Sequence, residues 1–404
     1  MEMPKSLSPD EVKFYDRQIK LAQCGLEGQL RLKQSKVAVI GAGGLGSSAL
    51  NALALTGVGH LVIFDFDRVS LSNLHRQVLY RHSDLGKIKV QVAKERLLEL
   101  NPWLEVTLYE RALRRYADLE LLQDVDLILD CTDRFAARAN IAAICKDLQV
   151  PHAYASVSST DGQVALFYPQ GACFRCVFRD LPTGGVIQSC DQGGVMGVSP
   201  MMIGAMQAQI AIDYLLSKRP KNTAQAKLSL ISTQDLRVYD LDLAQSSFCS
   251  LCNPQKVPQE QETKQNEVTQ YLEPFPIPMS TEEACFRIKN GWNPVIVDVR
   301  DTAERNQGYI ENSIHREVTK LLKILEGFDA KSLQKADPEL YQLLAARDTL
   351  VYCARGPRGE KAARALHKVR QNQAFHQPLG ISTKNKNEIY ELVGGYSRWS
   401  EQVK

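Results

Sequence analysis

Short apolar runs and amphipathic stretches alternate along the first half of the chain. The run at 36–40 is apolar and rich in β-branched residues, which is typical of a buried strand, and the apolar residues of 47–55 have helical spacing. Further strand-like runs lie at 61–64, 104–109, 125–129 and 151–156, with helical patterns among them. This alternation predicts an α/β fold with a doubly wound, mostly parallel sheet.

The pattern changes in the second half. Apolar runs at 163–167, 227–231 and 236–239 lack the regular intervening helices, so we expect antiparallel additions to the sheet. Residues 253–278 are rich in Pro, Gln, Glu and Lys, which is the composition of a linker. A second α/β pattern follows it. We therefore predict a first domain at 1–252, a linker at 253–278 and a second domain at 279–404.

A glycine-rich turn, Gly41-Ala-Gly-Gly-Leu-Gly46, separates the first predicted strand from the first predicted helix. Glycines let the backbone approach phosphates closely, and the new helix offers unpaired N–H groups and the positive end of its dipole. Asp65 ends the next strand, close to the spacing at which a carboxylate meets ribose hydroxyls in Rossmann-like folds. The sequence therefore predicts a nucleotide site.

The cations that follow favour ATP over NAD. Arg76 lies in Ser72-Asn-Leu-His-Arg-Gln77, and Lys89 comes shortly after it. A leaving pyrophosphate needs such cations, whereas hydride transfer does not. We interpret Arg81 and Lys87, in the same stretch, as solvated surface charges.

Two acidic residues follow the strand at 125–129. Asp133 is a candidate Mg²⁺ ligand, because open α/β sheets bind ligands at the carboxyl ends of their strands. Asp130 could instead cap the helix that we predict from Arg134. An NAD-dependent oxidoreductase fused to a binding module at 279–404 remains the alternative, but it gives Arg76, Lys89 and Asp133 no task.

The ten cysteines fall into different groups. Two C-x₂-C pairs, Cys173 with Cys176 and Cys249 with Cys252, have the pattern of a closed, structural four-cysteine zinc site. Redox-active disulfides are the less favoured alternative. We interpret Cys24, Cys131, Cys145 and Cys285 as small buried apolar side chains.

Two further cysteines have the setting of reactive groups. Cys190 lies in a glycine-flanked stretch that we read as an exposed loop, where chemistry is often carried. Cys353 follows a strand and precedes a helix, and Arg355 and Arg358 stand close by in the sequence. A helix N-terminus and neighbouring cations favour the thiolate, so Cys353 is a candidate nucleophile.

Composition and charge exclude several functions. A net charge of +3 and a pI of about 8.2 are too mild to indicate direct nucleic-acid or membrane binding. The start of the chain has no apolar signal region, and the most apolar long stretch, 198–216, carries Gln207, Gln209 and Asp213. We expect a soluble, cytoplasmic protein.

These motifs, in this order, resemble known families over nearly the whole chain. Residues 10–252 are similar to the ubiquitin-activating-like adenylyltransferases that act on sulfur carriers, and 279–404 resemble a rhodanese domain. The rhodanese motifs are Val297-Asp-Val-Arg300, Gly308 to His315, Cys353 and Gly394 to Trp399. Together the two parts resemble the eukaryotic adenylyltransferases and sulfurtransferases of molybdenum cofactor synthesis and tRNA thiolation.

The resemblance implies roles for individual residues. Cys173, Cys176, Cys249 and Cys252 match zinc ligands, Cys190 matches a cysteine that forms a thioester or disulfide, and Cys353 matches the persulfide carrier. Arg17 matches an arginine that reaches the ATP phosphates across a homodimer interface. The positions that match ATP contacts are Gly44, Asp65, Ser72, Asn73, Leu74, His75, Arg76, Lys89, Asp133 and Arg134.

The resemblance also implies cofactors and partners. The cofactors are ATP, Mg²⁺ and Zn²⁺. The carriers are the small molybdopterin synthase subunit and the ubiquitin-related modifier that feeds thiolation of the tRNA wobble uridine. A separate sulfurtransferase or cysteine desulfurase donates the persulfide. The loop after Cys353 departs from the usual polar pattern at Pro357 and Glu360, so we expect differently tuned sulfur transfer.

Overall fold

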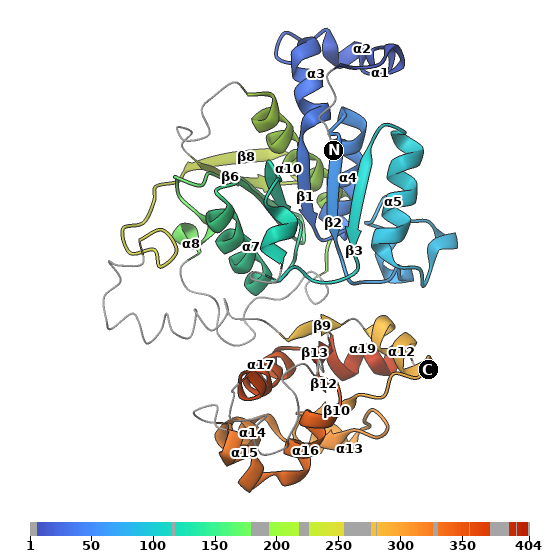
Figure 1. Ribbon diagram of the computed structural model, residues 1–404, viewed down its shortest axis with the longest axis vertical. Coiled ribbons are helices and arrows are strands. Elements are labelled where there is room, and N and C mark those ends of the chain that lie inside the picture. Colours follow the sequence, from blue (N-terminus) through green and yellow to red (C-terminus); the bar gives the residue numbers. More distant parts are fainter. Residues whose placement is uncertain are drawn as a thin grey trace. The chain divides into compact units, whose positions relative to one another are not determined.

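The computed structural model describes residues 6–114, 118–178, 194–217, 226–253, 276–279, 281–325, 330–354, 356–371, 388–392 and 394–402. The chain forms two compact units, Met1–Pro274 and Phe275–Lys404, and each is described here by itself (Figure 1). Nearly all of the predicted linker at 253–278 lies outside the described residues.

The first unit is built on one eight-stranded sheet with the order β3-β2-β1-β4-β5-β6-β7-β8. Its first five strands run parallel, and the last three are added antiparallel, which confirms the mostly parallel sheet. The strands are β1 (Lys36–Ile40), β2 (His60–Phe64), β3 (Glu105–Tyr109), β4 (Leu127–Asp130), β5 (His152–Ser158), β6 (Asp161–Phe167), β7 (Lys227–Ser232) and β8 (Arg237–Asp242).

Both faces of the parallel part are covered by helices. Alternate residues of a strand point to opposite faces, so Val37 and Val39 enter one core while Ala38 and Ile40 enter another. The first core includes residues of α4 (Gly44–Thr56), α5 (Lys89–Leu100) and α10 (Val198–Leu216), and the second includes α7 (Phe135–Leu148). Burial on both faces explains why these strands are continuously apolar.

Shorter helices complete the described part of the first unit. They are α1 (Pro9–Phe14), α2 (Asp16–Ile19), α3 (Gly25–Gln34), η1 (Leu71–Asn73), η2 (His82–Asp84), η3 (Leu119–Leu122) and α8 (Phe174–Val177). In α1 the Ser8 side chain and Glu11 form a reciprocal capping box, which fixes where the chain becomes helical. Among the described residues, no helix has the length and apolar character needed to cross a membrane.

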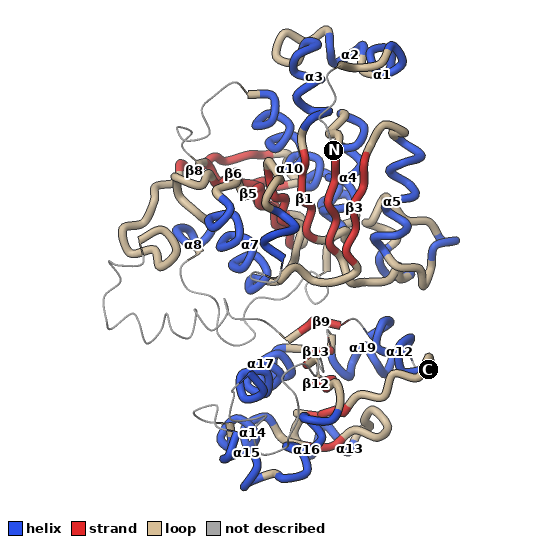
Figure 2. Tube along the Cα trace, in the orientation of Figure 1, coloured by secondary structure: helices blue, strands red, loops and turns tan. Residues whose placement is uncertain are grey.

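The second unit is a five-stranded parallel sheet with helices around it (Figure 2). Its strand order is β11-β10-β12-β13-β9. The strands are β9 (Ile277–Met279), β10 (Val295–Asp298), β11 (Ile314–His315), β12 (Thr349–Tyr352) and β13 (Ile389–Leu392). The helices are α12 (Thr281–Lys289), α13 (Thr302–Asn306), α14 (Val318–Ile324), α15 (Ala330–Ala336), α16 (Pro338–Ala346), α17 (Pro357–Gln371) and α19 (Gly395–Gln402).

Candidate functional site

The strand order of the first unit brings the predicted nucleotide-binding residues to one edge of the sheet. Strands β2, β1 and β4 are neighbours, so the segments after Phe64, Ile40 and Asp130 start side by side. The glycine turn packs tightly there: a Cβ on Gly46 would lie 1.9 Å from the Gly41 carbonyl oxygen. Gly41 itself has φ of +99°, so a larger residue is excluded by conformation as well as by space.

Asp65 is buried against the glycine turn. Its Oδ2 accepts a hydrogen bond of 2.7 Å from the Ala42 N–H, and its Oδ1 accepts one of 2.7 Å from the Asp67 N–H. Burial raises the pKa of Asp65, and the Lys89 ammonium opposes that shift. Each carboxylate oxygen keeps a further acceptor position, which fits recognition of ribose hydroxyls.

The candidate cations are oriented by specific partners. Lys89 is 3% exposed, and its Nζ lies 2.8 Å from Asp67 Oδ2. Arg76 donates from Nη2 to Asn73 Oδ1 at 3.0 Å and from Nη1 to the Ser72 carbonyl at 2.7 Å. These contacts hold both charges in place before a ligand arrives, which lowers the cost of binding phosphate.

The remaining predicted nucleotide positions differ in exposure. Ser72 and His75 are exposed, whereas Leu74 is half-buried. Arg81 and Lys87 are exposed, as expected for solvated charges, and Lys87 pairs with Asp84 at 2.9 Å.

The two acidic residues after β4 lie in different environments. Asp130 is fully buried, and its carboxylate accepts hydrogen bonds from the Thr132 backbone at 3.0 Å and lies 3.2 Å from His152 Nε2. The helix α7 begins after Arg134 without a side-chain cap, so the interpretation of Asp130 as its cap is wrong. Asp133 is exposed and Arg134 half-buried at this edge. An exposed carboxylate suits Mg²⁺, which binds through one or two carboxylates, water and phosphate.

Sequence reasoning did not identify Arg138, which supports the segment carrying Asp133. Its guanidinium donates to the Thr132 carbonyl at 2.9 and 3.2 Å and lies over the rings of Phe135 and Tyr154. A helical arginine has no sequence signal for such a role, because its partners are set by the tertiary fold. Arg17 lies in α2 with a side chain that is 95% exposed, and its action across a homodimer interface remains a prediction.

The two C-x₂-C pairs meet in one cluster. All four sulfur atoms lie within 4.8 Å of one another, and the closest pairs are 3.4, 3.6, 3.7 and 3.8 Å apart. Disulfide sulfurs would be about 2 Å apart. Four sulfurs at about 2.3 Å from a tetrahedral zinc ion would be separated by about 3.8 Å, so the set of Cys173, Cys176, Cys249 and Cys252 fits that metal.

Removing the metal from this cluster should loosen the first unit. The metal–sulfur bonds join the segment around α8 to the segment after β8, and these bonds are lost when the ion is removed. We therefore expect the melting temperature of the first unit to fall by about 10 °C or more. Calorimetry with and without a chelator measures the shift, and metal analysis should give about one zinc ion per chain. Cys252→Ala should lose the ion and Cys285→Ala should keep it. An unchanged melting curve after complete metal removal would contradict a structural role.

In the second unit, Cys353 follows β12 and is 1% exposed. Its Sγ accepts a hydrogen bond of 3.0 Å from the Gly356 N–H, and its carbonyl accepts one of 2.7 Å from Tyr396 at the start of α19. The sulfur therefore faces a backbone donor near the start of α17. Cys285 is half-buried, so its assignment to the fully buried cysteines is wrong, while Cys24, Cys131 and Cys145 are buried as expected.

Of the three other residues predicted to take part in or support the cysteine chemistry, the structure describes only Arg358. Cys190 and Arg355 lie outside the described residues. Arg358 is present and donates to Glu304 at 2.5 Å, with Asp301 at 3.8 Å. The hydrogen bond to Glu304 raises the pKa of Arg358 above its ordinary value, so this cation is already paired beside the cysteine loop.

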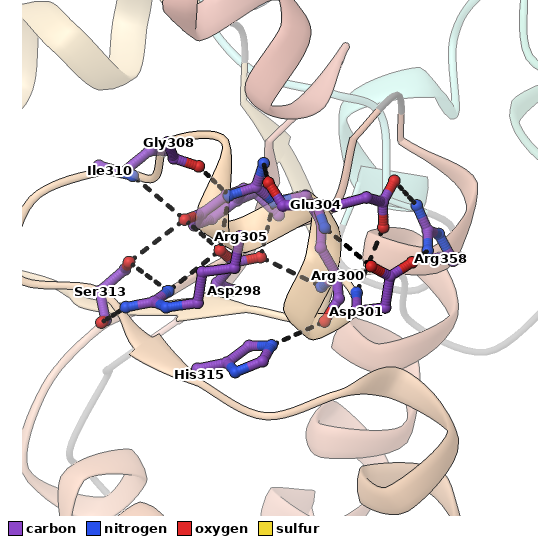
Figure 3. A network of polar contacts seen from close by, with 11 residues as sticks. Asp298, Arg300, Asp301, Glu304, Arg305, Gly308, Ile310, Ser313, His315 and Arg358 are labelled. Atoms are coloured by element: carbon purple, nitrogen blue, oxygen red, sulfur yellow. Dashed lines mark hydrogen bonds and ion pairs between the residues drawn. The ribbon is translucent and has the colours of Figure 1, made fainter.

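A buried polar network centres on Asp298 in the second unit (Figure 3). Asp298 ends β10 and accepts hydrogen bonds from Arg300 at 2.8 Å, Arg305 at 3.0 Å and the Tyr352 hydroxyl at 2.8 Å. Although burial opposes its ionisation, the hydrogen bonds from Arg300 and Tyr352 lower the pKa of Asp298. Since Tyr352 directly precedes Cys353, this carboxylate fixes the strand end that presents the sulfur.

Replacing Asp298 with asparagine should destabilise the second unit. The change leaves Arg300 and Arg305 without the carboxylate that balances their charge. Removing one partner of a buried ion pair lowers the free energy of unfolding by about 3–5 kcal/mol. Urea unfolding followed by tryptophan fluorescence measures the loss, because Trp292 and Trp399 lie in this unit. Asp235→Asn, at an exposed position of the first unit, is the control. A variant as stable as the parent would show that the network contributes nothing to folding.

Comparison with known proteins identifies both parts of the chain. Residues 15–274 match the ThiF family. The chain belongs to the ThiF family. Residues 283–402 of this ThiF-family protein match the rhodanese-like domain, which agrees with the second parallel sheet.

Several relatives of this ThiF-family protein extend over both units. The adenylyltransferase and sulfurtransferase uba4 of Aspergillus niger is 30% identical over 432 residues, covering 98% of this chain and 87% of that protein. The adenylyltransferase and sulfurtransferase MOCS3 of Culex quinquefasciatus is 30% identical over 410 residues, covering 98% and 89%. A sulfur carrier protein adenylyltransferase of Thermus thermophilus is 42% identical over 215 residues, covering 51% of this chain and 79% of that protein.

Solved structures agree with this fold. A crystal structure of E. coli MccB has a TM-score of 0.53 with 23% identity, covering 63% of this chain and 75% of that one. At that identity the likeness shows the fold alone.

Proposed function

We propose that this ThiF-family protein adenylates the C-terminal glycine of ubiquitin-like sulfur carriers and then transfers persulfide sulfur to give a thiocarboxylate. One observation supports the first step: adjacent strand ends bring the glycine turn and Asp65 to the same edge of the sheet as Asp133. The Lys89 ammonium lies near Asp65, because it forms an ion pair with Asp67. This is the set of groups that a reaction at the α-phosphate of ATP requires.

Each group of the first unit has a task in adenylation. The glycine turn and the start of α4 receive phosphates, while Asp65 binds ribose. Arg76 and Lys89 neutralise the charge that develops as the carrier carboxylate attacks the α-phosphorus and pyrophosphate leaves. Asp133 would hold Mg²⁺, which supplies further charge neutralisation.

Cys353 performs the second step. A separate sulfurtransferase or cysteine desulfurase loads it with sulfur as a persulfide. The terminal sulfur attacks the carrier carbonyl, AMP leaves, and an acyl disulfide joins carrier and enzyme. The Cys190 thiolate then attacks the Cys353 sulfur, so the thiocarboxylate is released and a Cys190–Cys353 disulfide remains for reduction; a thioester on Cys190 is the other route for this residue.

The proposal extends to the wider setting of the protein. We assign residues 1–252 to the adenylyltransferase domain, 253–278 to a linker and 279–404 to the rhodanese domain. The carriers are the small molybdopterin synthase subunit and the ubiquitin-related modifier, serving molybdopterin synthesis and thiolation of the tRNA wobble uridine in the cytoplasm. A homodimer would let Arg17 of one subunit reach ATP on the other.

A single experiment tests the function. The protein is mixed with ATP, Mg²⁺ and each candidate carrier, and the carrier is weighed by mass spectrometry while pyrophosphate is measured. An adenylate mass with pyrophosphate release supports the first step, and a thiocarboxylate mass after addition of a persulfide donor supports the second. If no carrier yields AMP, but NADH absorbance changes with a small substrate, the oxidoreductase reading would replace this one.

A further inference from the structure

The side chain of Tyr80 holds the peptide group between Ala42 and Gly43 in place. The Tyr80 hydroxyl donates a hydrogen bond of 2.8 Å to the Ala42 carbonyl, and both groups are buried. The preceding peptide group is held as well, because the Ala42 N–H donates to Asp65. The first non-glycine residue of the turn is thus fixed at both of its polar backbone atoms.

The direction of this carbonyl decides what the turn offers to a ligand. In a planar trans peptide the C=O and the following N–H point in opposite directions, and no cis peptide occurs in the described chain. With the Ala42 oxygen held on Tyr80, the Gly43 N–H points away from the Tyr80 side. Within the described residues it donates no hydrogen bond to another group. A rotated peptide would instead turn a carbonyl oxygen toward an incoming anion.

Glycine on both sides makes such a rotation easy. Gly41 and Gly43 flank Ala42, and Gly44 follows, so the turn has few side chains that restrict its dihedral angles. The hydrogen bond from Tyr80 supplies the restraint that the glycines lack.

Tyr80 is well suited to a donor role. Its ring packs in the main core beside the sheet, and its N–H donates to the Gln77 carbonyl at 3.2 Å. The same loop carries Arg76, so Tyr80 joins the segment of this cation to the glycine turn. Burial, and then the nearby Asp65 and Asp67 carboxylates, raise the pKa of Tyr80 well above its ordinary value, so the hydroxyl keeps its proton.

We propose that Tyr80 is a positioning residue for ATP: by holding the Ala42 carbonyl, its hydroxyl aims the Gly43 N–H at a phosphate of the nucleotide. This inference rests on the proposed function, because it needs the edge of the sheet to bind ATP. Tyr80 does not touch the reacting atoms. It acts through the backbone of the turn.

Tyr80→Phe removes the hydroxyl and keeps the ring. We expect ATP to bind about fivefold to tenfold more weakly, since the Ala42 carbonyl is left buried without its donor and the turn gains freedom. Isothermal titration of the full chain with Mg·ATP measures the dissociation constant. In carrier adenylation the KM for ATP should rise by a similar factor while kcat changes by less than about twofold.

A matched control separates this effect from loss of folding. Tyr214 also has a buried hydroxyl in the first unit, and this hydroxyl has no hydrogen-bond partner among the described residues. Tyr214→Phe should bind ATP as the parent does. Melting curves without nucleotide show whether each variant is folded at the assay temperature.

The outcomes distinguish this inference from the function on which it rests. If the parent protein binds no ATP, the proposed function fails. If the parent binds ATP and Tyr80→Phe binds it equally well, the function stands and the role of Tyr80 is refuted. Should Tyr80→Phe be unstable, hydrogen exchange at low temperature decides: faster exchange of the Ala42 N–H, with unchanged exchange in α10, supports the restraint, and equal exchange of the Ala42 N–H overturns it.

Discussion

Replacing Cys353 with alanine should reduce thiocarboxylate formation by at least about 1000-fold and leave carrier adenylation unchanged. The reason is chemical: alanine cannot hold the transferred sulfur. Cys285, the other cysteine of the second unit, does not replace it, because the backbone N–H at 3.0 Å near the start of α17 contacts the Cys353 sulfur. Mass spectrometry of the carrier, with pyrophosphate release measured in the same reaction, checks both halves of the result.

Cys285→Ala is the matched control, since Cys285 lies in α12 of the same unit and has no part in the proposed chemistry. This variant should form thiocarboxylate at the parental rate. If Cys353→Ala still forms thiocarboxylate, the rhodanese unit is dispensable and sulfur reaches the acyl-adenylate by another route. If adenylation is lost as well, the separation of tasks between the two units is wrong.

The sheet could be predicted because its strands are short and buried on both faces. The residues of β1 and β2 are apolar at every position that enters either core, and the glycine turn marks where the first strand must end. The antiparallel addition was predicted from a lack of intervening helices. That reason holds between β7 and β8 but not between β6 and β7, where α8 and α10 intervene. These are local signals, which one sequence contains.

Side-chain partners were much harder to predict. Lys89 was selected for its charge, but its pairing with Asp67, 22 positions earlier, arises because the segment after β2 folds back against the start of α5. Asp130 was one candidate for a helix cap, and instead it meets His152 on the neighbouring strand β5. The same limit hid Tyr80, whose acceptor lies 38 positions away. Such contacts depend on the tertiary fold, which spacing along the chain does not encode.

The cysteine cluster shows where a spacing signal suffices. Each C-x₂-C pair is local, and tetrahedral metal sites require two such pairs or their equivalents, so the set was predicted although 76 positions separate Cys173 from Cys249. The network around Asp298 is the opposite case. Its motif was visible in the sequence, yet nothing local indicates that one carboxylate would hold two arginines and the hydroxyl of Tyr352.

Asp133→Asn should reduce carrier adenylation by about 100-fold to 1000-fold and leave the fold intact. Asparagine has nearly the same shape, and the side chain of Asp133 is exposed, so no packing is lost. What is lost is the negative charge that would hold Mg²⁺ beside the phosphates, because an amide oxygen binds this cation more weakly than a carboxylate does. ATP–pyrophosphate exchange with a saturating carrier measures the effect directly, and raising Mg²⁺ should recover part of the activity.

The neighbouring Asp130 makes this test specific to one carboxylate. Asp130 is buried on Thr132 and His152, so it is committed to the structure of the strand end and cannot take over an exposed ligand position. Asp235→Asn, an exposed carboxylate beyond β7, controls for the general loss of one negative charge and should keep full exchange activity. If Asp133→Asn exchanges pyrophosphate as fast as this control, Asp133 has no place in the site. The cations Arg76 and Lys89 would then have to neutralise the triphosphate with a metal held by phosphate and water alone.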